Sequence, residues 1–307
     1  MALNSHRRAR DSCRAGEGVF RQLYILCDLE GASQISPANK TAMHYGSALW
    51  QQEGRGFITS DLKAVCEAAN EFGIDEIIIN DDHDSGHKKP NVLVQELPRN
   101  VRMVKRPHMP GTPRKMVRGE LCGIIIVGQH AMYGGGGFAP HTIQSPPIEA
   151  VTINGIKVGE IGLELALFMD AKLLAIVGDE AAAKEARVLC PHVVTIPVKS
   201  LERNWFPQAK ENYPVIKEKV LQALRQREHA EGLHLDPPYR FWLKVTENFI
   251  FDSEKRFFLR WLAKPYFFGR YQGRMEGREA FWQAKTIVGG LSALQATRLF
   301  VKKRAQA

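Results

Sequence analysis

The chain has 307 residues, 44% hydrophobic and 24% charged, so it can bury a sizeable core in one large or two modest domains. No apolar run approaches the ~20 residues that span a membrane, and no low-complexity tract predicts a repetitive protein. The formal charge of +9 arises in residues 201–307, which hold 20 Lys and Arg against 11 Asp and Glu, whereas opposite charges cancel over residues 1–200.

Residues 1–21 carry arginines but no apolar signal-peptide core, so we expect a disordered extension there, with a transit peptide as the alternative. The apolar run "LYILC" predicts a buried strand over 23–27. A helix should follow over about 59–72, because residues 59–61 offer N-cap side chains and Gly73 can end it.

Strand and helix patterns continue to alternate up to residue 200. Apolar runs predict strands at 75–80, 101–106, 122–128 and 192–199. Residues 149–160 alternate around Asn154-Gly155, which is a strong signal for a type I′ hairpin, and a helix should begin near Glu160. Residues 172–189 are typical of a strand followed by a helix. This alternation predicts an α/β domain over 22–200, with a largely parallel central sheet flanked by helices.

The pattern changes after residue 200. We predict a polar helix over about 208–228, a strand over 239–249, and a long amphipathic helix over 275–303 that is weakened at Gly289-Gly290. No linker-like composition separates the two parts. We therefore expect residues 201–307 to form a smaller, basic C-terminal α+β subdomain that packs on the first domain. Its positive charge suits solvated helix faces, and without a nucleic-acid-binding motif we expect neither a nucleic-acid nor a membrane partner.

The five cysteines are widely spaced and form no C-x-x-C motif, which suits buried thiols in a reducing compartment. We therefore predict a cytoplasmic protein. Cys27 adjoins an acidic residue, but strand alternation turns it away from the carboxylate face, so we interpret it as a buried core residue.

The stretch "YILCDLEGAS" places two carboxylates, Asp28 and Glu30, at the end of a predicted buried strand. Side chains two residues apart on a strand share a face, so like charges would crowd there unless a cation compensates them. In parallel sheets, ligands bind at the carboxyl ends of the strands. Three further candidates follow predicted strands or open the helix after the hairpin: His83, His130 and Glu160.

Carboxylates mixed with imidazoles, without a thiolate, suit Zn²⁺, with Mn²⁺ or Co²⁺ as relatives. These five residues exceed the needs of one tetrahedral ion, so we predict two metals that share a carboxylate and activate a water molecule. The "GGGG" segment at 134–137 is interpreted as a mobile segment that lets His141 reach the site. We expect Asp81 and Asp82 to cap turns, and we assign the remaining histidines to loops or the core: His44, His87, His108, His192, His229 and His234.

The motifs "DLEG", "NDDHDS", "GQHA", "PHT" and "NGIKVGEIGL", in this order and spacing, resemble the DppA-type D-aminopeptidase family of zinc peptidases. The resemblance covers roughly residues 22–200. It implies two zinc ions per chain, with Asp28 as the bridging ligand, and it implies that His141 is the catalytic histidine, as nucleophile or acid/base. It further implies a ring-like homo-oligomer that removes N-terminal residues, preferably D-amino acids, from short peptides or amides.

Two departures from the family pattern concern the substrate. Glu164 stands where we expect an amide or small polar residue, so it either contributes to substrate binding or is an ordinary solvent-facing helix residue. Residues 199–208 replace a stretch expected to be small, and Trp205 and Phe206 can reshape or close the substrate pocket. Two other functions remain as alternatives: a non-catalytic metal-containing binding or scaffold protein, and an anion-binding module that uses the basic C-terminus.

Overall fold

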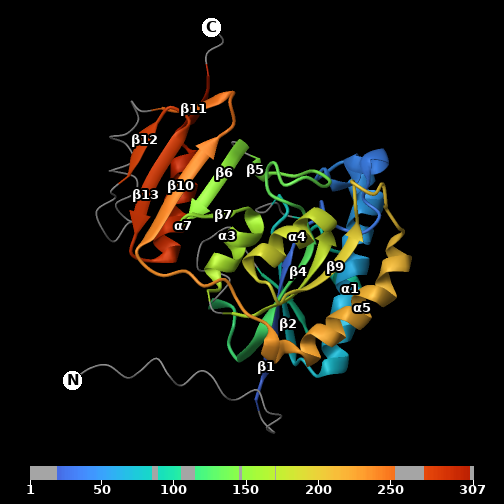
Figure 1. Ribbon diagram of the computed structural model, residues 1–307. Helices are drawn as coiled ribbons and strands as arrows, with labels where there is room; N and C mark the ends of the chain where they lie inside the picture. Colours follow the sequence, from blue (N-terminus) through green and yellow to red (C-terminus); the bar gives the residue numbers. More distant parts are fainter. Residues whose placement is uncertain are drawn as a thin grey trace, which may run out of the picture.

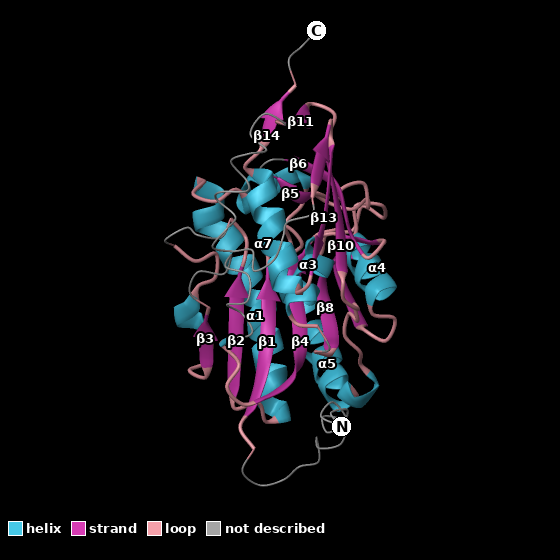
Figure 2. Ribbon diagram, turned by 90° about the vertical axis from the view of Figure 1, so that its left-hand side faces the viewer, coloured by secondary structure: helices cyan, strands magenta, loops and turns pink. Residues whose placement is uncertain are grey.

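The computed structural model describes residues 19–84, 89–104, 115–144, 147–169, 171–252 and 273–304. A six-stranded sheet lies at its centre, and all five of its strand pairings are parallel (Figures 1 and 2). In spatial order its strands are β3 (Val101–Met103), β2 (Glu76–Asp81), β1 (Arg21–Cys27), β4 (Glu120–Gln129), β8 (Leu173–Asp179) and β9 (Val194–Lys199). The parallel α/β class predicted from the sequence is confirmed.

Strand alternation divides the core between the two faces of this sheet. Leu23 and Ile25 point to the face that α1 (Arg55–Phe72) and α5 (Ala209–Arg225) cover. Tyr24 and Leu26 point to the opposite face, which α3 (Glu160–Leu167) and α4 (Glu180–Leu189) cover. Asp28 continues this second series, which directs it toward α3. The described residues also form the short helical turns η1 (Pro37–Met43), η2 (Trp50–Gly54), η3 (Val94–Glu96) and η4 (Arg227–His229).

A second, antiparallel sheet packs beyond α3 (Figure 1). Its strands, in spatial order, are β12 (Arg274–Glu276), β13 (Glu279–Ala284), β10 (Tyr239–Val245), β6 (Pro147–Ile153) and β5 (Thr142–Gln144), with β7 (Ile156–Val158) paired to β6. The sheet takes strands from both sides of residue 200, and the division of the chain at that residue stays a prediction. β11 (Phe249–Phe251) pairs with β14 (Val301–Lys303).

The hairpin predicted at 149–160 is present. Asn154 and Gly155 connect β6 to β7 with φ of 53° and 84°, as a type I′ turn requires. The hairpin leads directly into α3, so it positions Glu160 at the first turn of that helix.

The first helix begins earlier than predicted. It starts at Arg55 after the π-helical turn η2, although it ends as expected at Gly73, whose φ is 94°. The side chains expected to cap it have other partners. The Thr59 hydroxyl donates to the Arg55 carbonyl at 2.6 Å, and the Asp61 carboxylate accepts from the Ser33 amide at 2.8 Å.

The single helix predicted over 275–303 is wrong. The segment forms β12, β13, α7 (Ile287–Arg298) and β14 instead. Gly277, at φ of 57°, turns the chain between β12 and β13, and alternate residues Ala280 and Trp282 are buried on β13. Thr286 then caps α7 by accepting from the Gly289 amide, so turn and cap signals outweigh the apparent helical period.

The helix α7 packs on the antiparallel sheet and contacts α3. Gly290 permits this approach, because a Cβ atom there would collide with the Phe241 ring of β10. Within the described ranges no helix has both the length and the apolar character that crossing a membrane requires.

Candidate metal centre

The loop after β1 lies directly against the end of β4. The Asp28 amide donates to the Val127 carbonyl at 2.9 Å, and the Gly31 amide donates to the Gly128 carbonyl at 2.7 Å. A Cβ atom on Gly31 would overlap the Gln129 carbonyl, so only glycine permits this approach. The two acidic side chains of "DLEG" are thereby fixed beside the residue that follows β4, His130.

Asp28 and Glu30 are 7% and 6% exposed, and both contact the imidazole of His83. The His83 Nδ1 atom lies 3.1 Å from Asp28 Oδ1 and 2.7 Å from Glu30 Oε2. Its Nε2 atom lies 2.7 Å from the Met43 carbonyl. The structure therefore brings together the polar residues that follow β1 and β2.

His130 approaches the same carboxylates from the end of β4. Its Nε2 atom lies 3.3 Å from Asp28 Oδ2 and 3.7 Å from Glu160 Oε2, while Nδ1 lies 2.9 Å from the Ala131 carbonyl. The residue is 2% exposed, and Nε2 has no hydrogen bond of good geometry among the described residues. This nitrogen atom is buried, faces two carboxylates and forms no hydrogen bond of good geometry in the described chain. Such an environment is typical of a metal ligand.

His141 returns to this site through the glycine-rich loop, in which Gly134, Gly136 and Gly137 all have positive φ. The His141 amide donates to the Ala131 carbonyl at 3.0 Å, and its Nδ1 atom lies 2.9 Å from the Ala139 carbonyl. Its Nε2 atom lies 3.7 Å from Glu160 Oε1 and 4.0 Å from Glu30 Oε1. Glu160 Oε1 in turn accepts the Ile143 amide at 2.7 Å.

Among the described residues, three overlapping triads have ligand atoms within 4.8 Å of one another. They are Asp28–Glu30–His83, Asp28–His130–Glu160 and Glu30–His130–His141. All six residues predicted as ligands or as the catalytic histidine thus converge at one edge of the parallel sheet. Asp28 joins the first two triads through different oxygens, since Oδ1 faces His83 and Oδ2 faces His130.

The electrostatics of the cluster favour a cation. Burial by itself would lower the pKa of His83, but the charge of Glu30 and hydrogen bonds to Asp28 and Glu30 raise that pKa well above its usual value. Burial by itself would also lower the pKa of His130, but the hydrogen bonds and charges of Asp28 and Glu160 raise that pKa well above its usual value. Burial also raises the pKa of Glu30, and the neighbouring charge of Asp28 adds to this. The carboxylates therefore attract positive charge, and the oxygen and nitrogen donors fit a zinc-type ion.

Sequence reasoning missed Lys199, which lies at the end of β9 and is fully buried. Its ammonium donates to the carbonyls of Glu30 and Ile35, the latter at 3.1 Å, and lies 4.6 Å from the centroid of the Phe138 ring. Burial lowers the pKa of Lys199 to about 7. Lys199 thus connects the loop that carries Glu30 with the loop that carries His141. In the sequence, a lysine at the end of an apolar predicted strand is the feature that could have indicated this residue.

A small cavity of about 20 Å³ adjoins the metal-binding cluster. Its lining residues are Leu26, Cys27, Asp28, Asp82, Ile126, Gln129, Glu160, Ile161 and Glu164. The solvent-facing alternative for Glu164 is wrong, because its Oε2 atom is buried. Burial and the charge of Asp82 raise the pKa of Glu164 well above its usual value. Burial likewise raises the pKa of Cys27, which agrees with its interpretation as a core thiol rather than a nucleophile.

The remaining predicted residues lie outside this cluster or outside the described ranges. Trp205 is 36% exposed and stacks with Arg203, whose guanidinium carbon lies 5.0 Å from the ring centroid. Its neighbour Phe206 meets Phe138 edge-on at 6.5 Å, so the 199–208 segment contacts the loop that carries His141.

Asp81 accepts two hydrogen bonds from Asn91, as a loop-capping residue does. His87 and His108 lie outside the described residues.

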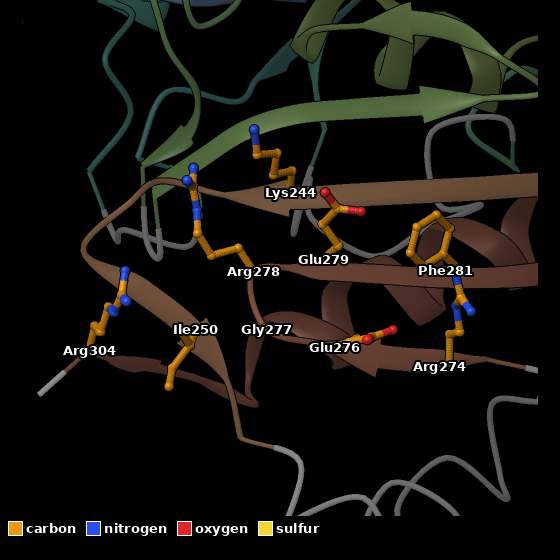
Figure 3. Close-up of a pocket in the computed structure, with 9 residues that line it drawn as sticks. All are labelled: Lys244, Ile250, Arg274, Glu276, Gly277, Arg278, Glu279, Phe281 and Arg304. Carbon is orange, nitrogen blue, oxygen red and sulfur yellow. The ribbon is translucent and has the colours of Figure 1, made fainter.

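A larger hollow of about 670 Å³ lies on the antiparallel sheet, away from these ligands (Figure 3). Lys244, Arg274, Arg278 and Arg304 give it a basic lining. Glu149 pairs with both Lys244 and Arg278, and the Arg274 guanidinium stacks on Phe281 at 4.7 Å. Much of the positive charge expected to attract an anion is therefore already compensated.

The fold and the site together define an α/β protein with a carboxylate–imidazole metal centre at the strand ends. The sequence model of the Peptidase M55 family, described as D-aminopeptidase, matches residues 22–252. This is well over half of the chain, so the chain belongs to that family, which confirms the resemblance seen in the motifs.

Two relatives extend the comparison. The D-aminopeptidase of Bacillus subtilis (strain 168) is 28% identical over 180 residues, which is 58% of this chain and 63% of that protein. The match thus spans less than two thirds of the relative's length. A solved structure, Zn-dependent D-aminopeptidase DppA from Bacillus subtilis, a self-compartmentalizing protease, matches with a TM-score of 0.74 and 22% identity. That match covers 91% of this chain and 97% of the other, so the two share a fold.

Proposed function

We propose that the chain is a zinc-dependent aminopeptidase that removes N-terminal amino acids, preferably D-amino acids, from short peptides or amides. The observation that carries this proposal is the convergence of six metal-binding or proton-transferring side chains at the strand ends. Family membership and the names of both relatives support it.

Two zinc ions per chain suit the donor set better than one. Asp28 would bridge them, because its two oxygens face different histidines. Glu30 and His83 would complete one side, and His130 and Glu160 the other. When bound, such ions activate a water molecule near neutral pH and polarise the scissile carbonyl.

His141 is proposed to move the proton that the leaving amine needs. Its Nδ1 atom donates to the Ala139 carbonyl, which leaves Nε2 to face the carboxylate cluster. The stacked ring of His130 and the amide bond to Ala131 fix its orientation. A fixed imidazole beside the reacting atoms is suited to general acid–base catalysis.

Assembly, location and substrate contacts belong to the same proposal. The self-compartmentalizing neighbour supports a ring-like homo-oligomer. Four of the cysteines are free and buried in the described chain, which supports a cytoplasmic location. Glu164 and Trp205 are proposed to contact the substrate, Glu164 because it lines the cavity beside the ligands.

The test compares hydrolysis of D-alaninamide, L-alaninamide and their N-acetyl derivatives by the intact chain. We expect release of ammonia from the free amides, faster for the D-enantiomer, with loss on chelation and recovery on addition of zinc. The acetylated amides should remain intact. Zinc-loaded protein that hydrolyses none of them would overturn the proposal and favour a binding or scaffold role. Salt-sensitive nucleic-acid binding that survives Asp28→Ala would instead favour the anion-binding alternative.

A further inference from the structure

A second pair of carboxyl groups lies beside the candidate metal centre. Asp82 follows β2, and Glu164 lies one turn after Glu160 on α3. Their side chains are hydrogen-bonded to each other, and both line the small cavity of about 20 Å³. Asp28 and Glu160 form part of the same lining, so this cavity opens toward the metal-binding cluster.

The sheet face below the pair holds buried polar atoms that lack partners. Tyr24 and Leu26 share a face of β1, and Leu26 is in register with Asn80 on β2. Tyr24 and Asn80 are 0% and 1% exposed. Among the described residues, Tyr24 Oη, Asn80 Oδ1 and Glu164 Oε2 have no hydrogen-bond partner. Burying a polar atom without a hydrogen-bond partner is unfavourable, so this region is built for a polar occupant.

The missing occupant is a hydrogen-bond donor. The Glu164 Oε2 atom has no hydrogen-bond partner among the described residues, and Glu164 forms no ion pair with any Lys or Arg there. Gln129, which is 5% exposed, lines the same cavity. A primary ammonium group has three N–H donors and no acceptor, which matches a lining rich in oxygen atoms.

A further metal ion fits this position less well. No described triad of metal-binding side chains includes Asp82 or Glu164, whereas three triads form in the neighbouring cluster. A phenol hydroxyl and an amide oxygen are also weaker ligands for a zinc-type ion than the carboxylates and imidazoles next to them.

We propose that Asp82 and Glu164, with Gln129, form a subsite that binds a primary ammonium group of the substrate. This inference rests on the proposed aminopeptidase function and refines it. Because the subsite shares Asp28 and Glu160 with the metal centre, it receives a group from the residue whose carbonyl lies at the metals. That group is the α-ammonium of the N-terminal residue, and its recognition would restrict cleavage to peptides with a free amino terminus.

The test uses Glu164→Gln and Asp82→Asn in the full-length chain, with Glu202→Gln as a matched control because Glu202 is 79% exposed. Zinc content and thermal unfolding verify that each variant folds and retains its metals. We expect KM for alaninamide to rise at least tenfold in both variants, with kcat within about threefold of the wild type. The control should be unchanged. KM for lysinamide should rise equally, because its α-ammonium occupies the same subsite, and a rise confined to lysinamide would overturn the assignment to the α-ammonium.

A binding measurement separates failure of this inference from failure of the proposed function. Alaninol retains the primary ammonium but has no amide bond to hydrolyse, so calorimetry with alaninol does not depend on turnover. Binding should weaken at least tenfold in both variants, even if no amide is hydrolysed. Unchanged KM and unchanged alaninol affinity would overturn the inference and leave the aminopeptidase proposal intact. Loss of zinc from the Glu164→Gln variant would overturn it as well, because the pair would then support a metal.

Discussion

The imidazole rings of His130 and His141 stack with centroids 3.8 Å apart and an interplanar angle of 14°. Their Nε2 atoms face the two oxygens of Glu160 at 3.7 Å each. The nitrogens differ in surroundings, since His130 also lies 3.3 Å from Asp28, whereas His141 lies nearest to Glu160 and then to Glu30. The surroundings of His130 suit a metal ligand, and those of His141 suit a proton carrier in the same site.

The stacked pair therefore predicts two different mutant phenotypes. His130→Gln should lower both zinc content and hydrolysis, because it removes a proposed ligand. His141→Gln should retain zinc but lower kcat by about 10²- to 10⁴-fold, the usual size of a general acid–base contribution. Metal analysis and steady-state kinetics on both variants check this. Zinc loss in His141→Gln equal to that in His130→Gln would show that His141 is a ligand instead.

The close approach at Gly31 predicts a local requirement for glycine. Gly31→Ala should destabilise the fold by about 3 kcal/mol, at the upper end of overpacking costs, because a backbone carbonyl cannot move aside as a side chain can. It should also reduce zinc content. Gly46→Ala is the matched control, since Gly46 has a positive φ of 78° but nothing within 4 Å, and should cost only about 1 kcal/mol. Denaturant unfolding measures both, and equal costs would contradict the expected clash.

Buried Lys199 predicts a pH-dependent stability. Its pKa falls from 10.5 in a solvated chain to about 7 in the fold, so between these values the unfolded state binds a proton that the folded state does not. Stability should therefore rise as pH increases from about 7 to about 10. Other groups titrate in this range, so the informative quantity is the difference between the wild type and Lys199→Met. The increase in the free energy of unfolding between about pH 7 and pH 10 should be smaller in the variant. An identical pH dependence of stability in the two proteins would contradict a buried lysine with a lowered pKa.

The raised histidine pKa values predict that zinc and protons compete. His83 and His130 hold protons more tightly than free histidine, and both must release them to bind a metal. Zinc affinity should therefore increase with pH through the neutral range. Calorimetry in two buffers of different ionisation enthalpy should show protons released on zinc binding. An affinity that stays constant between about pH 6 and pH 8, without proton release, would disagree with the proposed ligand set.

The sequence predicted the centre of the fold because buried parallel strands have a distinct pattern. Continuous apolar runs end at Asp28, His83 and His130, and parallel strands bring such ends to one edge of a sheet. The hairpin before Glu160 was also predictable, since Asn-Gly specifies its turn locally.

The rest depends on contacts between distant parts of the chain. The hydrogen bond from Lys199 to the Glu30 carbonyl joins residues 169 positions apart, and no local pattern encodes it. The pairing of β6 with β10 is equally non-local. Over 275–303 the apolar spacing suited a helix, but the turn at Gly277 and the cap at Thr286 set the actual boundaries. The position of Asp82 after a predicted strand favours a turn cap, whereas its contact with Glu164 forms only in the folded chain.

Zinc content of the purified chain, measured alongside that of Asp28→Ala, tests the central claim most directly. Asp28 faces histidines on both sides of the cluster, so its loss should affect both proposed ions. We predict about two zinc ions per wild-type chain and fewer than one in the variant. Fewer than one zinc in the wild type, with the same content in Asp28→Ala, would contradict the account.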